Sequence, residues 1–233
     1  TTALDLPAVP PSLLVIGGGY IGLELGTVYA RLGSQVSVVE LTDGLLPGVD
    51  RDLVKPLQRR LATLFGDRIY LGTKVTAMSD AGDAVSVSCE GENRSGTERY
   101  SHVLVAVGRR PAAERLGLEH TRVQLDSRGF IVTDAHLRTA EPTILAIGDV
   151  AGEPMLAHKA THQAKVAVDT VLGQAAEFTD RTIPAVVFTD PEIAWAGLTE
   201  EQARPLNRPY RLAAYPWAAS GRAYPHSRSG GTS

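Results

Sequence analysis

The chain has 233 residues, of which 43% are hydrophobic and 21% charged, and its formal net charge is −3 at pH 7. This composition is typical of a globular protein of one or two domains, and it lacks the basic excess of a nucleic-acid-binding protein. No apolar run approaches the roughly 20 residues that span a bilayer, and residues 1–11 lack the pattern of a secretory signal.

Residues 1–11 contain three prolines and are predicted to form an extended linker. The apolar run Leu13–Ile16 then meets three glycines, and a helical apolar pattern follows at once. With Gly22 the spacing is G-x-G-x-x-G, in which Gly17 permits a sharp turn and Gly19 lets backbone approach a pyrophosphate. Free N–H groups and the helix dipole would bind that anion. The sequence therefore predicts a strand, a turn and a helix N-terminus that form a dinucleotide site.

A second strand is predicted over residues 35–40, and it ends in Glu40. Glu40 lies 23 positions beyond Gly17, close to the spacing of the ribose-binding carboxylate in dinucleotide sites. A carboxylate accepts hydrogen bonds from ribose hydroxyls and repels a 2′-phosphate, and the next basic residue is Arg51. The pattern favours NAD over NADP; the alternative is a structural βαβ unit in which Glu40 is merely solvated.

The middle of the chain mixes helical and extended patterns. Residues 50–66 are predicted to form a helix whose apolar stripe is Leu53, Leu57, Leu61 and Leu64. Short extended pieces follow at 69–71 and 74–76, and residues 85–89 and 100–107 look like the arms of a hairpin. Cys89, the only cysteine, is interpreted as a strand residue, and it weakly favours a reducing, cytoplasmic setting.

The second half of the chain contains further apolar runs. Strands are predicted over residues 103–108, 130–132, 143–149 and 183–188, and a helix over residues 155–172. His158 and His162 share one face of that helix, but no third ligand accompanies them, so we expect no metal site. Residues 220–233 are rich in Ser, Gly and Arg and poor in apolar side chains.

Five motifs follow one another along the chain: the glycine loop, Glu40, Gly108-Arg109-Arg110-Pro111, Ala146-Ile147-Gly148-Asp149, and Met155-Leu156-Ala157-His158-Lys159-Ala160. In kind, order and spacing they resemble the pyridine nucleotide–disulfide oxidoreductases over roughly residues 5–222. Within that family they are most similar to the dihydrolipoamide dehydrogenases, the flavoproteins of 2-oxoacid dehydrogenase complexes.

The resemblance implies an α/β fold in which a Rossmann-like NAD domain is inserted into a split FAD domain. Residues 12–112 would be the NAD domain, with a parallel sheet, a βαβ unit and a β-hairpin or meander. Residues 113–181 would be the second part of the FAD domain, and residues 182–222 the start of an α+β interface domain used for dimerisation. Residues 223–233 depart from the family's pattern and would be an atypical tail.

The resemblance also implies two cofactor sites. The NAD-binding residues would be Gly17, Gly18, Gly19, Tyr20, Ile21, Gly22, Glu24, Glu40, Val75 and Gly108, with Glu24 near the nicotinamide. The FAD-binding residues would be Asp149, Met155, Leu156, Ala157 and His158, with Asp149 accepting hydrogen bonds from the ribityl chain or the adjoining ribose. Arg109 or Arg110 could contact NAD or could merely fix the domain junction.

The activity implied by the resemblance is oxidation of dihydrolipoamide by NAD⁺ through FAD, in a homodimer that serves a 2-oxoacid dehydrogenase complex. The family's redox C-x4-C pair and its His–Glu pair match no residues here. We therefore expect an internal segment of a longer protein that has no catalytic residue of its own and no lipoamide activity alone.

Three alternatives stay open at this point. The parent could be another FAD- and NAD(P)-dependent disulfide reductase, although NADP-dependent members carry basic residues where this chain has Glu40. It could be a cysteine-free transhydrogenase of the same superfamily. In a different class, the chain could be a non-catalytic NAD-binding module.

Overall fold

The computed structural model describes residues 2–179, 182–207 and 209–216. The chain divides into two compact units, one ending at Gly197 and one beginning at Leu198. None of the helices in the described ranges has the length and apolar character needed to cross a bilayer. The expected domain boundaries near residues 112, 181 and 222 stay predictions, and the tail 223–233 lies outside the described residues.

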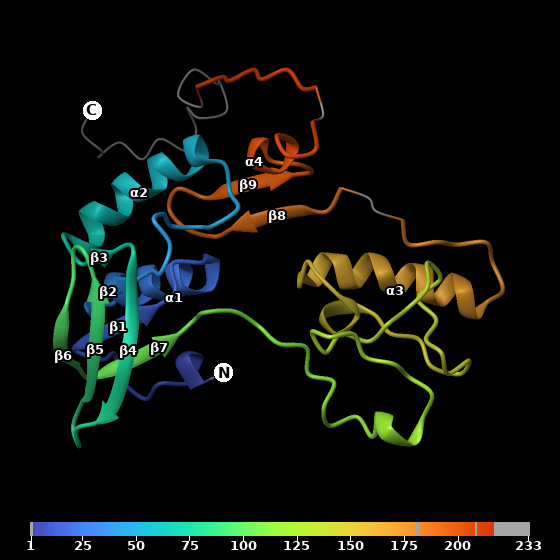
Figure 1. Cartoon of the computed structure of the whole chain (residues 1–233), viewed down its shortest axis with the longest axis horizontal. Helices are drawn as coiled ribbons and strands as arrows, with labels where there is room; N and C mark the ends of the chain where they lie inside the picture. Colours follow the sequence, from blue (N-terminus) through green and yellow to red (C-terminus); the bar gives the residue numbers. More distant parts are fainter. Residues whose placement is uncertain (1, 180–181, 208, 217–233) are drawn as a thin grey trace. The chain divides into compact units, whose positions relative to one another are not determined.

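A four-stranded parallel sheet forms the centre of the first unit, with strand order β3-β2-β1-β7. Its strands are β1 (Ser12–Ile16), β2 (Gln35–Val39), β3 (Ile69–Tyr70) and β7 (His102–Val105). Helix α1 (Tyr20–Arg31) connects β1 to β2, and α2 (Arg51–Phe65) follows β2 (Figure 1). The expected βαβ unit around the glycine loop is therefore confirmed.

Both faces of this sheet are covered, because successive side chains of a strand point to opposite faces. Leu13 and Val15 of β1 join the core with the buried side chains of α1 and α2. Leu14 lies on the opposite face, where it packs with Val87 and Tyr100 of an antiparallel sheet. An uninterrupted apolar run such as residues 13–16 is therefore what a strand between two packed layers requires.

The antiparallel sheet corrects one expectation about the hairpin. Its strands, in spatial order, are β4 (Thr73–Asp80), β5 (Val85–Gly91) and β6 (Gly96–Tyr100). The second hairpin arm is thus β6 and not residues 100–107, because the chain after Tyr100 returns to pair with β1 as β7. Because β7 is an edge strand of its sheet, Val105 is 56% exposed despite its apolar sequence, and the strand ends at Val105 and not at residue 108 as predicted.

The apolar stripe of α2 is shifted from the predicted one. Leu57 and Leu61 are buried as expected, but Leu53 is 40% exposed. The buried positions beside them are Val54 and Phe65, so the stripe follows a spacing of three, four and four residues. Because consecutive residues lie about 100° apart around the helix axis, a helix that directs Val54 toward the core directs Leu53 toward solvent.

Residues 113–178 contain little regular structure apart from α3 (Ala157–Val171). The strands predicted over 130–132 and 143–149 are wrong: each run makes only one isolated bridge, Leu125 with Ile131 and Arg138 with Leu145. Two short 3-10 turns, η2 (Leu118–His120) and η3 (Gly148–Ala151), interrupt the segment. A strand needs a neighbouring ladder to satisfy its backbone, and the described residues supply none to these two runs.

A β-hairpin and two short helices complete the fold. Strands β8 (Pro184–Val187) and β9 (Ile193–Ala196) pair antiparallel, and Val187 and Ile193 join the core that contains the α1 and α2 side chains. The expected linker is not fully extended, because the 3-10 helix η1 (Thr2–Leu4) lies within it. In the second unit, α4 (Glu200–Ala203) begins with a capping box formed by Thr199 and Gln202.

Candidate functional site

The glycine turn between β1 and α1 is shaped by steric limits. Gly17 has φ +106°, and a Cβ on it would overlap the backbone carbonyl of Ala106. A Cβ on Gly22 would overlap the carbonyl oxygen of Gly17 and lie 2.9 Å from Val15 Cγ1. A Cβ on Gly19, in contrast, would have no described atom within 4 Å. Two glycines thus hold the turn together, and the third leaves open space in front of the helix.

That open space lies at the N-terminus of α1. Gly19 is the N-cap residue in an extended conformation, and it has no side chain to cap the helix. The first N–H groups of a helix have no intrahelical acceptors, and the dipole adds positive potential there. An anionic group such as a pyrophosphate fits these donors.

The Glu40 carboxylate organises the turn from the end of β2. Its Oε2 accepts a hydrogen bond from the Gly18 N–H at 2.6 Å, and its Oε1 accepts from the Thr42 N–H and hydroxyl at 2.8 Å each. Glu40 is only 8% exposed. Because a carboxylate offers about four acceptor positions, these three bonds leave about one on Oε2 for a ligand hydroxyl.

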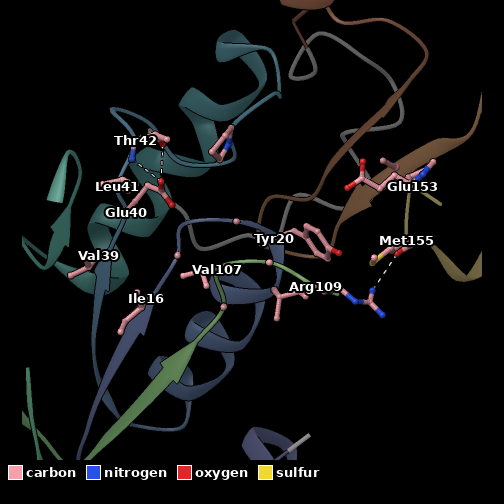
Figure 2. Close-up of a pocket in the computed structure, with 18 of the residues that line it drawn as sticks. Ile16, Tyr20, Val39, Glu40, Leu41, Thr42, Val107, Arg109, Glu153 and Met155 are labelled. Atoms are coloured by element: carbon pink, nitrogen blue, oxygen red, sulfur yellow. Dashed lines mark hydrogen bonds between the residues drawn. The ribbon is translucent and has the colours of Figure 1, made fainter. Parts of the chain in front are cut away.

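A cavity of about 840 Å³ runs past the glycine turn. Figure 2 shows Glu40 and Thr42 on one side of it, Glu153 and Met155 on the other, and Tyr20 between them. This volume is within the range of cofactor sites. The cavity lining includes the predicted NAD residues Gly17, Gly19, Tyr20, Ile21, Glu40, Val75 and Gly108.

Arg109 connects this cavity to the residues predicted for flavin. Its guanidinium donates to the Met155 carbonyl at 3.2 Å (Figure 2). It also donates to the Asp149 carboxylate at 2.5 Å. Arg109 and Met155 both line the cavity. Arg109 thus lines the cavity and also bonds to the segment that carries Asp149 and Met155, and its role toward NAD stays a prediction.

Two buried side chains of α3 hold the turn that carries Asp149. The Lys159 ammonium donates to the carbonyl of Gly148 at 3.1 Å and to that of Gly152, so it joins both ends of η3. Gln163 Oε1 accepts the Gly148 N–H at 2.7 Å. Lys159 is 1% exposed, and its burial lowers the pKa of its amine. These contacts fix the position of the Asp149 backbone.

Some predicted site residues are engaged elsewhere. Glu24 Oε1 accepts the backbone N–H of Phe188 at 2.8 Å, just after β8. His158 Nε2 contacts the Pro184 carbonyl at 2.5 Å. Met155 and Leu156 line the cavity, whereas Glu24, Ala157 and His158 are absent from its described lining.

The residues present fit NAD, and they fit one side of a flavin. The uncapped N-terminus of α1, the space beside Gly19 and the free acceptor of Glu40 suit a pyrophosphate and a ribose. On the flavin side, α3 begins at Ala157 without a side-chain cap, and Asp149 supplies a carboxylate. Both groups are donors or acceptors that a flavin nucleotide can use.

Comparisons with known proteins decide the family. A sequence profile described as "Pyridine nucleotide-disulphide oxidoreductase" matches residues 1–164, and a profile of the dimerisation domain of the same family matches residues 183–232. The chain belongs to this family. The resemblance drawn from the five sequence motifs is therefore confirmed.

Individual relatives agree with this result. The chain is 46% identical to a dihydrolipoyl dehydrogenase of Vibrio parahaemolyticus and 40% identical to one of Bacillus subtilis, over 96% of its own length and 47% of theirs. It is similar to the HOCl-induced flavoprotein disulfide reductase RclA of Escherichia coli, with a TM-score of 0.83, 31% identity and coverage of 96% of this chain and 51% of that one. For LpdA of Mycobacterium tuberculosis the TM-score is 0.76 at 33% identity, over 86% and 43% of the two chains.

The chain spans about half the length of the curated relatives that it matches. The expected α/β fold with a dinucleotide-binding core is confirmed by the parallel sheet and by these structural neighbours. Which residues bind each cofactor stays a prediction.

Sequence reasoning missed four residues that shape the site. Thr42 holds Glu40, Trp195 lines the cavity, and Lys159 and Gln163 hold η3. Lys159 lies inside a motif that was recognised, but a lysine in a helix gives no sign that it is buried. Trp195 lies about 90 residues beyond Gly108, the last predicted NAD residue, and the β8–β9 hairpin brings it to the cavity.

Proposed function

We propose that this chain carries the NAD site and one side of the FAD site of a flavoprotein oxidoreductase. The observation that carries the proposal is the glycine turn held by Glu40 beside an uncapped helix N-terminus, inside a cavity of about 840 Å³. In the full-length protein, we infer, the reaction is oxidation of dihydrolipoamide by NAD⁺. The relatives named dihydrolipoyl dehydrogenase support this reaction.

The chain's own residues would position the dinucleotide. The first N–H groups of α1 would bind the pyrophosphate, and the remaining acceptor of Glu40 would bind a hydroxyl of the adenosine ribose. The same negative charge would repel a 2′-phosphate, which favours NAD over NADP. When bound, NAD supplies a nicotinamide ring that accepts a hydride.

On the other side of the cavity, the residues would hold and polarise a flavin. Asp149 would accept hydrogen bonds from flavin hydroxyls while sharing its charge with Arg109. The N-terminus of α3, near Met155, would stabilise negative charge on the flavin ring. Lys159 and Gln163 would keep Asp149 in place.

The assembly and the cellular setting are proposed from the comparisons with relatives. The match of residues 183–232 to a dimerisation domain supports a homodimer. Service in a 2-oxoacid dehydrogenase complex and a cytoplasmic location follow only from the likeness to dihydrolipoyl dehydrogenases. A second candidate is a reductase of another disulfide, which the similarity to a flavoprotein disulfide reductase favours.

The site itself is tested by titrating the 233-residue chain with NADH and NADPH, with nucleotide fluorescence as the signal. We expect NADH to bind more tightly, and Glu40→Gln to reduce that preference by about tenfold, since it removes the charge that faces the ribose. Asp43→Asn removes an exposed negative charge three residues after Glu40 and should leave the preference unchanged. Absence of NADH binding in the unaltered chain would reject the site.

The reaction is tested with the complete gene product. Dihydrolipoamide-dependent NADH formation, together with flavin absorbance, would support the dehydrogenase, and turnover of another disulfide only would support the second candidate. The 233-residue chain holds one cysteine and cannot form a redox pair, so we expect it to have no lipoamide turnover. A complete protein that binds NADH without flavin or turnover would be a non-catalytic module.

A further inference from the structure

The wall of the cavity next to Glu40 is a loop without regular structure, residues 41–50, here called the β2–α2 loop. Leu41, Thr42 and Pro47 of this loop line the cavity. A loop of this kind positions a ligand only if something fixes its backbone, since an unrestrained loop loses conformational entropy when a ligand orders it.

Arg51, the first residue of α2, supplies that restraint. Its Nε donates to the Val49 carbonyl at 2.9 Å and its Nη1 to the Leu45 carbonyl at 2.7 Å. Its Nη2 donates to the carbonyls of Leu46 and Val49, at 2.5 Å each. Four of the five guanidinium N–H donors therefore bind carbonyls of the β2–α2 loop. Such charge-assisted bonds are about twice as strong as neutral ones.

The restrained loop is in turn bonded to the glycine turn. The Leu46 N–H donates to the Gly18 carbonyl at 2.9 Å, and Leu46 has φ +51°, a conformation that only a well-held leucine keeps. Leu45 is fully buried, and its Cδ2 lies 2.7 Å from the place where a Cβ on Gly18 would stand. Contacts thus run from Arg51 through the loop to the turn that would hold the pyrophosphate.

Resting on the proposed function, we propose that Arg51 is a positioning residue of the NAD site and not a ligand of a 2′-phosphate. Arg51 does not belong to the described lining of the cavity, and its donors are directed at the loop carbonyls. The first basic residue after Glu40 therefore serves the shape of the site, which leaves the carboxylate to discriminate between the two nucleotides.

The test is a titration of the 233-residue chain and its Arg51→Met variant with NADH and with NADPH. A positioning role predicts that both affinities fall by the same factor, about tenfold, so that their ratio is unchanged. Arg51→Lys keeps the charge but lacks the planar fork, so it should recover only part of the loss. Hydrogen exchange at the Leu46 amide should accelerate in Arg51→Met without any nucleotide present.

Arg68→Met is the matched control, because Arg68 also donates to a backbone carbonyl, that of Val36 at 3.0 Å, but Val36 belongs to β2 and not to the β2–α2 loop. We expect Arg68→Met to lower the melting temperature without changing either affinity. A selective loss of NADPH binding in Arg51→Met, or unchanged affinities and unchanged Leu46 exchange, would overturn the proposal. If the unaltered chain binds neither nucleotide, the proposed function itself fails, which is a distinct result.

Discussion

Residues 12–105 and residues 113–178 use different means to hold their shape. The first region buries its apolar side chains between helices, a parallel sheet and an antiparallel sheet. The second region has a small core around Ala113, Ile131 and Ala146, with isolated bridges in place of sheets. Its turns depend on side chains that bond to backbone, such as Asp126, Thr139 and Lys159. The difference shows that two regions of one chain can differ widely in how much apolar burial and sheet pairing stabilises them.

The comparison predicts different rates of local opening. Limited proteolysis should cut residues 113–178 about tenfold or more faster than residues 12–105, because opening there breaks few apolar contacts and no sheet. Mass spectrometry of the early fragments measures this order. Earlier cleavage within residues 12–105 would reverse the comparison.

The largest effect of a single substitution is expected at the glycine turn. Gly22→Ala places a Cβ against the Gly17 carbonyl and Val15, so it should cost about 1–3 kcal/mol of unfolding free energy. Gly26→Ala, one turn later in α1, meets only ordinary contacts beyond 3.4 Å and should be neutral or stabilising by up to about 1 kcal/mol. Chemical denaturation followed by circular dichroism measures both, and equal shifts in the two variants would contradict the prediction.

A smaller effect is expected from the buried lysine of the second region. Lys159→Met leaves the carbonyls of Gly148 and Gly152 without their donor, although it also removes the cost of burying an ammonium. We expect the unfolding free energy of this region to fall by about 1–2 kcal/mol. Protease cleavage should accelerate within residues 113–178 and stay unchanged within residues 12–105. Lys165→Met, an exposed position on the same helix, is the control and should change neither rate.

The smallest effect on local stability is expected from lowering the pH. Hydrogen bonds from the backbone N–H groups of Phe130 and Arg128 hold the pKa of Asp126 below its ordinary value of 3.8. The folded pKa lies below the unfolded one, so this contribution is present above pH 3.8 and is lost as the pH falls through the folded pKa. Because Asp126 is exposed, only a slight increase of cleavage near residues 126–130 is expected in an acid-active protease assay. Asp126→Asn should show less of this pH dependence.

The two regions also differ in how far sequence patterns predicted them. In the first, the β1–α1–β2 unit and Glu40 followed from periodicity and glycine spacing, which are local properties. The hairpin arm and the α2 stripe were misplaced by a few residues, because pairing with β1 and the facing of the helix depend on distant contacts. In the second, the apolar pattern of residues 143–149 predicts a strand, but pattern alone does not reveal whether a partner strand exists, and the run makes a single isolated bridge.

The residues of the candidate site also differ in whether the sequence predicts them. The residues that define the glycine turn have a spacing that any reader of the sequence can find. The residues that hold it, Arg51 and Thr42, act through backbone carbonyls and a carboxylate, and such contacts leave no pattern in the sequence. In the sequence, Arg51 is distinguished only as the first basic residue after Glu40.

The three hydrogen bonds of Glu40 have a consequence for the rates of binding. They hold the Gly18 backbone and the start of the β2–α2 loop before any nucleotide arrives. A site that is ordered in advance needs no slow rearrangement during an encounter, so association should approach the ordinary limit for a small ligand. Preference between related nucleotides would then be expressed in how long each one stays bound.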